Sequence, residues 1–380
     1  MGLCAAKSAA YEEDEYPDAE SEDEEEQANL DDDRVQQLCN GGLKLTGVDV
    51  LELLGRNDGC ITRLTDAKKP RGVGHASCNE QCGKASNDAW VEKLSKALAN
   101  NTSIAELTFG GGHQVSSKGV QYLTESLKTN ESLEKLAMTF GTPGIGADGA
   151  VTLSKWLATN SSLTILDLTD NDLHDAGVIA ISDALKGGVL NIKTLALPSN
   201  KIGVEGVTAL ANSFDVARAL TSVQLENNNL GDAGVMVLAT ALGNNNSVTT
   251  LMLDSNKIKS EGAVALAKML ETNACLSRLS LESHTIMHDS DKVNDIDNEG
   301  ALAFAEMLKV NKTLRFLNLN DAGTHPESVE VLAKVMNDTN ETLLSLKVTP
   351  NDHHLIEAAC KRNMTSHRAA RRWLRKATHT

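Results

Sequence analysis

The chain has 380 residues, of which 41% are hydrophobic, 23% charged and only 3% aromatic, and its formal net charge is −16. That hydrophobic content is enough for a large buried core, and no apolar run approaches the ~18 residues of a membrane-spanning helix. The seven cysteines are scattered, which favours reduced thiols over a disulfide framework. We therefore expect a cytoplasmic protein.

The first residues resemble a dual acylation signal. Gly2 follows Met1 and is a candidate for myristate, and Cys4 is a candidate for palmitate. A single acyl chain anchors a protein only marginally, so a second one is what stable attachment needs. Ala6 departs from the pattern, which prefers Ser or Thr there. The resemblance implies a lipoprotein at the inner face of a membrane, and an unmodified N-terminus is the alternative.

Two segments precede the regular part of the chain. Residues 1–33 contain 14 acidic residues and one Lys. Such a segment cannot offset the entropy cost of ordering, so we predict a disordered acidic tail. Residues 34–99 are predicted to form an N-terminal cap and an irregular first repeat, with a strand near residues 61–64 and an inserted loop at residues 65–84.

One pattern then recurs from residue 163 to residue 276. Its first copy consists of Leu163, Leu166, Leu168, Asn171 and Leu173, and the next copies begin after 29, 28 and 28 residues. An apolar-x-x-apolar-x-apolar segment followed by Asn is typical of a strand-plus-helix unit too small to bury its own apolar face. Neighbouring units must therefore stack.

This pattern resembles the leucine-rich repeats of the ribonuclease-inhibitor type over about residues 88–348. The resemblance implies an α/β solenoid, a horseshoe with parallel strands on the concave face and helices outside. We assign leucine-rich repeats to residues 100–348 and a basic C-terminal capping helix to residues 349–380. A short stretch, residues 305–314, also resembles tropomodulin.

Two residue types keep the register of the repeats. The Asn that follows each strand is predicted to satisfy backbone groups in the turn, and Gly112, Gly141, His284 and Ala322 stand near that place in the less regular units. A Gly near the start of each outer helix indicates a close backbone approach or a special backbone angle. Asn101, Asn130, Asn160, Asn311 and Asn340 each precede a strand and suit a helix end and turn.

Equivalent residues of stacked strands lie about 5 Å apart. This spacing brings together three successive carboxylates, Glu226, Asp254 and Glu282, which repel one another by ~1 kcal/mol or less per exposed pair. A cationic group opposite them would relieve that repulsion. We predict that the concave surface binds a protein partner with a basic surface, through Asp167, Gln224, Glu226, Met252, Asp254, Arg278 and Glu282.

The two inserted loops and the residues beside them contain candidate metal ligands. In the first, the thiol and imidazole groups have the chemistry of a zinc site but not a typical spacing: Cys60, His75, Cys78 and Cys82. In the second, five residues match a calcium-binding EF-hand loop: Asp295, Asp297, Glu299, Gly300 and Glu306. Gly300 is also the repeat glycine, so we predict an outer helix after it, a surface loop at residues 285–299, and no metal site.

The tail is predicted to be a basic helix. Its first turns can cover the last repeat, as the end of a solenoid requires. A cationic stripe follows, made of Arg368, Arg371, Arg372 and Arg375. We interpret it as a solvated face, and a site for acidic protein, phosphate or lipid headgroups is the alternative.

The sequence contains no recognisable catalytic motif, such as a phosphate-binding Gly-rich loop or a nucleophile elbow. We expect a non-enzymatic interaction scaffold with no cofactor, no nucleic-acid partner and no small-molecule substrate. Two alternatives remain. One is a tropomodulin-like regulator of actin filaments, and the other is a GTPase-activating protein of the Ran type, since Ran activators use the same repeat.

Overall fold

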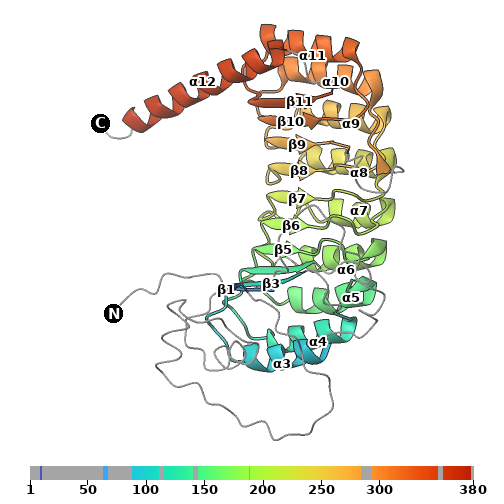
Figure 1. Cartoon of the computed structure of the whole chain (residues 1–380), viewed down its shortest axis with the longest axis vertical. Coiled ribbons are helices and arrows are strands. Elements are labelled where there is room, and N and C mark those ends of the chain that lie inside the picture. The colour runs from blue at the N-terminus through green and yellow to red at the C-terminus, as the bar shows by residue number, and fades with distance from the viewer. Residues whose placement is uncertain are drawn as a thin grey trace, which may run out of the picture. The chain divides into compact units, whose positions relative to one another are not determined.

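The computed structural model describes residues 9–10, 63–66, 88–110, 115–139, 144–187, 189–283, 292–349 and 354–377. Gly2, Cys4 and the four zinc candidates lie outside the described residues. The chain divides into two compact units: residues 1–172 with 189–191, and residues 173–188 with 192–380. Each unit is a stack of strands that alternate with helices along the chain (Figure 1).

Unit 1 contains β1 (Ala9–Ala10), β2 (Arg63–Asp66), α3 (Asp88–Leu98), β3 (Glu106–Gly110), α4 (Ser117–Ser126), β4 (Lys135–Thr139), α5 (Gly146–Leu157) and β5 (Ile165–Asp167). Its strands pair in sequence order, and every pair is parallel.

Unit 2 contains α6 (His174–Lys186), β6 (Thr194–Ala196), α7 (Val204–Ala211), β7 (Ser222–Gln224), α8 (Gly231–Gly243), β8 (Thr250–Met252), α9 (Ser260–Leu270), β9 (Arg278–Ser280), α10 (Asp297–Val310), β10 (Phe316–Leu319), α11 (Pro326–Asp338), β11 (Ser345–Val348) and α12 (His354–Ala377). Strands β6 to β11 also pair in order and in parallel. The α/β solenoid predicted from the repeat is confirmed.

The core of each repeat comes from the apolar positions of the pattern. In unit 2 the middle residue of each strand is almost fully buried, as Leu195, Val223 and Leu251 show. The inner faces of the helices cover these strands, with Val235, Leu238 and Leu242 of α8 at 0% exposure. Burial of each such side chain stabilises the fold by roughly 1.5–3 kcal/mol, which is why a 28-residue unit needs its neighbours.

The Asn after each strand connects one repeat to the next. Asn228 accepts hydrogen bonds through Oδ1 from the backbone N–H groups of Asn200 (2.9 Å) and Ile202 (3.0 Å) of the preceding repeat. Its Nδ2 donates to the carbonyls of Leu197 (3.0 Å) and Leu225 (2.8 Å). The predicted structural role is confirmed. We call this series the strand-exit Asn ladder.

The prediction for the seventh repeat was wrong in one detail. His284 stands near the expected place in the sequence, but Asn294 fills the ladder position. Its Oδ1 accepts from Asn256 N (2.8 Å) and Ile258 N (3.0 Å). The extra residues of this repeat therefore lie between the strand and its Asn, because the ladder contact is kept and the connection before it lengthens.

Two of the repeat glycines leave room for an Asp side chain of one helix to cap the helix of the following repeat. Asp175 of α6 accepts through Oδ1 from Gly203 N (2.6 Å) and Gly206 N (3.0 Å), and a Cβ at Gly206 would lie 2.6 Å from that oxygen. Asp232 of α8 does the same at Lys259 N and Gly262 N. The close approach expected from the sequence is therefore present, and it serves to place a carboxylate at a helix N-terminus.

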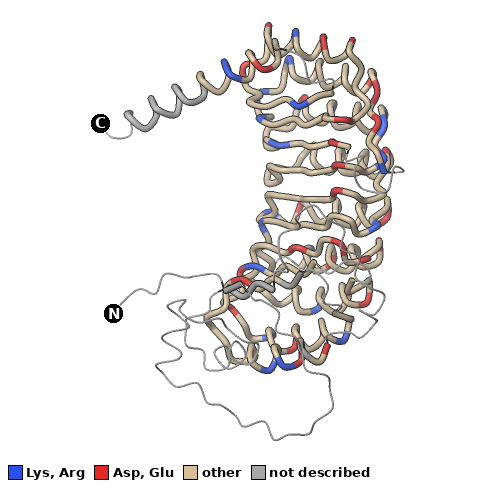
Figure 2. The backbone as a smooth tube through the Cα atoms, viewed as in Figure 1, with Lys and Arg blue, Asp and Glu red and all other residues tan. Residues whose placement is uncertain are grey.

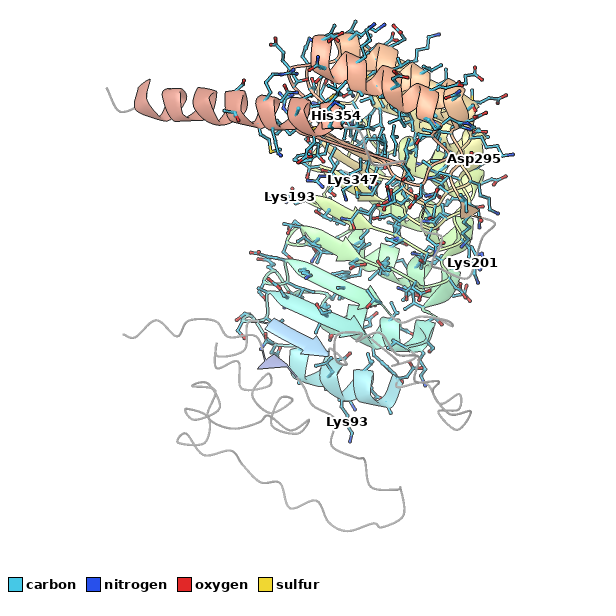
Figure 3. The ribbon with its side chains drawn as sticks, turned by 45° about the horizontal axis from the view of Figure 1, so that its top comes forward. Lys93, Lys193, Lys201, Asp295, Lys347 and His354 are labelled. Atoms are coloured by element: carbon cyan, nitrogen blue, oxygen red, sulfur yellow. The ribbon has the colours of Figure 1, made fainter. Side chains whose placement is uncertain are left out.

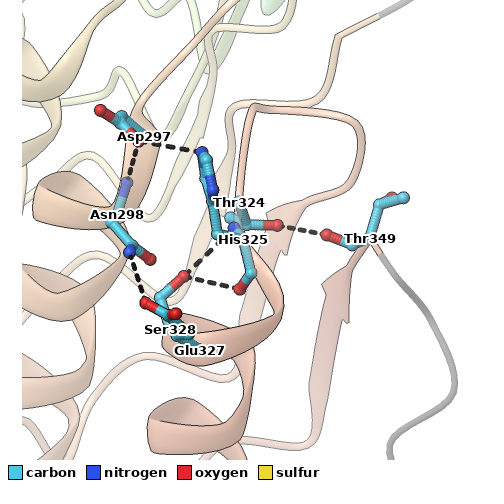
Figure 4. Close-up of polar contacts among 7 residues, drawn as sticks. All are labelled: Asp297, Asn298, Thr324, His325, Glu327, Ser328 and Thr349. Atoms are coloured by element: carbon cyan, nitrogen blue, oxygen red, sulfur yellow. Dashed lines mark hydrogen bonds and ion pairs between the residues drawn. The ribbon is translucent and has the colours of Figure 1, made fainter.

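The five residues that match an EF-hand loop in the sequence do not form such a loop in the structure. Helix α10 begins at Asp297, so Glu299, Gly300 and Glu306 lie on a helix instead of in a loop. The Asp297 Oδ1 atom is 3.0 Å from Nε2 of His325, the residue that precedes α11 (Figure 4). No group of three or more His, Cys, Asp or Glu residues in the described ranges is arranged to hold a metal ion.

Helix α12 closes unit 2. Its Asn363 donates through Nδ2 to the carbonyls of Asn340 (3.1 Å) and Leu343 (2.9 Å). Asn340, which lies before β11, donates in the same way to Leu308 O of the previous repeat (2.8 Å). Arg362 adds hydrogen bonds to three carbonyls at the end of α11 and just beyond it. Asn363 therefore stands where a further repeat would place its own Asn.

Candidate functional site

The surface that carries the predicted site is the strand face of unit 2. We use this name for the side chains of β6–β11, and of the residues directly after each strand, that alternate with the buried core positions. The register places the residues of this face in parallel rows, because each strand pairs with the next without a shift. One such row consists of Ala196, Gln224, Met252, Ser280, Asn318 and Lys347.

The carboxylate row lies where the strands end. Backbone hydrogen bonds continue the sheet past the strands, from Asn227 N to Asp254 O (2.8 Å) and from Ser255 N to Glu282 O (2.9 Å). These bonds bring Glu226, Asp254 and Glu282 next to one another as the sequence predicted. In Figure 2 Lys and Arg residues of unit 2 lie along the left edge, where the strands begin, and also at the right edge, where they lie among acidic residues.

The three carboxylates differ in their surroundings, which the sequence did not predict. Asp254 is only 4% exposed. Its Oδ1 accepts a short hydrogen bond from Ser280 Oγ and a second from Glu282 N (2.7 Å). The expectation of an exposed Asp254 was wrong, because a hydroxyl on the next strand lies within reach. Its carboxylate is held inside the surface, where it supports the backbone of Glu282.

Glu282 is half-buried and faces two amides. Its Oε2 accepts from Asn318 Nδ2 (2.7 Å) and its Oε1 from Asn320 Nδ2 (3.2 Å). Glu226 is also half-buried. Two neutral amides therefore hold the Glu282 carboxylate in place at this edge of the strand face.

A basic and aromatic pair lies at the opposite edge. Arg278 and Phe316 are paired residues at the first positions of β9 and β10. The guanidinium carbon of Arg278 is 4.2 Å from the centre of the Phe316 ring, which is the geometry of a cation–π contact. Arg278 is exposed. Sequence reasoning named Arg278 but missed Phe316, although both stand one residue before the buried leucine of their strands.

The remaining predicted residues lie apart from this pair. Gln224 and Met252 are half-buried in the middle of the strand face. Asp167 belongs to unit 1, where its Oδ1 accepts from Thr169 N (3.0 Å) and Thr169 Oγ1 (2.6 Å). Lys193, before β6, and Lys201, after it, lie at opposite edges in Figure 3, which shows the direction in which the strands run. Arg368, Arg371, Arg372 and Arg375 lie on α12.

A family model described as Leucine Rich repeat matches residues 159–182, 190–211, 217–239 and 244–267. The chain is built from leucine-rich repeats. The matched segments coincide with the most regular part of the pattern, which agrees with the strand-exit Asn ladder found there. Leucine-rich repeats support binding of protein partners.

Relatives share the repeats over part of their length. The chain is 32% identical over 189 residues to mouse NACHT, LRR and PYD domains-containing protein 14, a match that covers 48% of this chain and 18% of the relative. It is 34% identical over 110 residues to rat leucine-rich repeat-containing protein 73, which covers 28% of this chain and 34% of the relative. The chain therefore spans much less than two thirds of these relatives.

Among solved structures, a chain titled Leiomodin-1 Actin-Binding Site 2 (ABS2) is similar, with 18% identity, a TM-score of 0.38 and coverage of 52% of this chain and 95% of that one. None of the described helices is both long and apolar enough to cross a bilayer.

Proposed function

We propose that this chain is a non-catalytic protein-interaction module that binds a partner with a basic surface on the strand face of unit 2. The observation that carries the proposal is the row of Glu226, Asp254 and Glu282 at the carboxyl ends of β7–β9. Neutral amides and a hydroxyl hold two of these carboxylates in position. A basic group of a partner would meet a negative charge that needs no rearrangement.

The test is affinity capture of natural partners by the wild type and by the double variant Glu226→Lys/Glu282→Lys. We expect the variant to lose partners that the wild type retains, because the reversed charge repels a basic surface. The matched control is Glu261→Lys/Glu271→Lys, which reverses two exposed charges at α9 on the helix side. Equal capture by the wild type and the Glu226/Glu282 variant would contradict the proposal.

The membrane tether is a separate part of the proposal. Myristate on Gly2 and palmitate on Cys4 would hold the interaction module at a membrane. Membrane fractionation of the wild type, Gly2→Ala and Cys4→Ser tests it. We expect each variant to move to the supernatant, and an unchanged distribution would remove the tether.

The two alternative functions rest on sequence resemblance. Pointed-end elongation of actin filaments tests the tropomodulin-like hypothesis, and GTP hydrolysis by Ran tests the GTPase-activating hypothesis. Activity in either assay would replace the simple scaffold as the function of this chain.

A further inference from the structure

The strand face has two chemically different ends. Glu226 and Glu282 lie where the strands end, and Arg278 lies where β9 begins. Arg278 and Glu282 are four residues apart on one extended segment, which corresponds to about 13 Å. A partner segment that follows the strand direction would contact both ends at once.

The position of the Arg278 side chain favours binding of an anionic group. Its guanidinium carbon lies over the Phe316 ring, 4.2 Å from the ring centre, so part of the side-chain freedom that binding would remove is already lost. Within the described ranges, no carboxylate is paired with this guanidinium. A guanidinium binds a carboxylate through two parallel hydrogen bonds.

The surroundings of Arg278 favour a singly charged anion. The side chains between Arg278 and Glu282 on the strand face are neutral, as Ser280 and Asn318 show. The next cation of the face, Lys347, lies two strands away on β11. Arg315, one residue before Phe316, donates through Nη1 to the backbone carbonyls of Lys312 and Thr342. A phosphate with two negative charges would therefore meet Arg278 beside an acidic edge, whereas a carboxylate needs only the one guanidinium.

We propose that Arg278, held by Phe316, binds a carboxylate of the partner, and that the partner segment combines this carboxylate with a basic group about 13 Å away. The inference rests on the proposed function and makes it more specific. The strand face then distinguishes a mixed-charge segment of the right spacing from a segment that is only basic.

Three synthetic peptides with amidated C-termini and a fluorescent label test this inference by fluorescence anisotropy with the full chain. The basic peptide has a block of four Lys. The spaced peptide has the same block with two Glu placed four residues beyond it. The interspersed peptide has the composition of the spaced peptide, but its two Glu stand between the Lys residues. A fourth peptide replaces the spaced Glu pair by a free C-terminal carboxylate, which distinguishes a side-chain carboxylate from a chain terminus.

We expect the wild type to bind the spaced peptide about tenfold more tightly than the interspersed one, as a charge-assisted hydrogen-bonded pair provides. Arg278→Gln should abolish this preference without weakening binding of the basic peptide. Phe316→Leu, which keeps an apolar side chain but removes the ring, should reduce the preference. Lys268→Gln, an exposed change on α9, is the matched control and should leave it unchanged.

Equal binding of the spaced and interspersed peptides by the wild type would overturn the inference, as would a preference that survives Arg278→Gln. Neither result would affect the proposed function, provided that the basic peptide binds and that Glu226→Gln/Glu282→Gln weakens it. Failure of the basic peptide to bind the wild type, or equal binding by that double variant, would instead contradict the proposed function.

Discussion

Single residues with left-handed backbone mark the turns that leave the strands. Ser199, Asn227 and Ser255 occupy equivalent places with φ of 56°, 57° and 53°, and Lys201 and Lys257 follow two residues later with φ of 58° and 61°. A side chain in this region costs roughly 1–2 kcal/mol. The turns therefore hold strain that the strand-exit Asn ladder offsets, since each Asn closes several backbone hydrogen bonds.

Replacement of Lys257 by Gly should relieve part of this strain. Lys257 is exposed, so its side chain contributes little packing. We expect Lys257→Gly to raise the free energy of unfolding by about 0.5–1 kcal/mol in urea denaturation, and Lys257→Val to lower it by at least about 1 kcal/mol. Lys268→Gly in the last turn of α9 is the control, with an expected loss of up to about 1 kcal/mol. A loss of stability in Lys257→Gly would show that the turn is not strained.

Cys360 should make stability depend on alkaline pH. Burial raises the pKa of its thiol above the ordinary 9.0, and a backbone hydrogen bond from Leu346 offsets part of this rise. The folded state thus holds the thiol proton more tightly than the unfolded state. The contribution of this thiol to the free energy of unfolding is complete below the ordinary pKa and decreases as the pH rises above about 9. We expect the difference in unfolding free energy between wild type and Cys360→Ala to be constant up to pH 8 and to shrink above it. A constant difference up to pH 10 would contradict this assignment.

Helices of one repeat are capped by a side chain of the repeat before it. Asp232 at the start of α8 caps α9 because Gly262 leaves room for its carboxylate. The cap therefore stabilises the contact between two repeats as well as one helix. Among α6 to α9, only α6 and α8 carry this Asp, since the equivalent residue of α7 is Val204 and that of α9 is Ser260.

Loss of this cap should be measurable. We expect Asp232→Ala to lower the unfolding free energy by about 1–2 kcal/mol, since two backbone N–H groups lose their acceptor. Gly262→Ala should be at least as harmful, because its new methyl group would displace the same carboxylate. Asp183→Ala, an exposed change on α6 whose partner is Lys186, is the control and should cost less than about 0.5 kcal/mol. Equal effects of Asp232→Ala and Asp183→Ala would contradict the capping role.

The strands, the helices and the ladder were predictable because the repeat keeps one spacing along the chain. The position of Asn294 was not, since the insertion separates it from its strand and only the ladder contact identifies it. The burial of Asp254 was also hidden from the sequence. The burial depends on the hydrogen bond from the Ser280 hydroxyl. The repeat pattern predicts which residues are neighbours but not which of them form hydrogen bonds.

In a stack of repeats, each repeat contacts only its neighbours, so the ends decide where unfolding begins. Unit 2 ends at α12, where Ile356, Ala359, Cys360 and Asn363 are buried and Met364, Thr365 and Ser366 are exposed. Figure 1 shows the rest of α12 running out from the last repeat. The helix therefore changes, at Asn363, from a cover for the repeats to a projecting segment.

Two truncations should distinguish the contributions of the two halves of α12 to stability. Removal of residues 367–380 should leave the urea midpoint unchanged, whereas removal of residues 354–380 should lower it and accelerate hydrogen exchange in β11. The physical reason is that the second deletion exposes the apolar end of the stack and leaves the carbonyls of Asn340 and Leu343 without Asn363. The variant Asn363→Ala should reproduce part of this effect, by about 1–3 kcal/mol. Equal midpoints for both truncations would show that α12 does not protect the stack.

Asn363 also sets how the chain can grow. A further repeat could stack on the last one only by displacing α12, because Asn363 already donates to the carbonyls of Asn340 and Leu343. A copy of residues 220–247 inserted before Val248 would find matching partners on both sides, since the units on either side of it share one period. The terminal helix therefore ends the stack of repeats. Whole repeats can be gained or lost only in the interior of the stack.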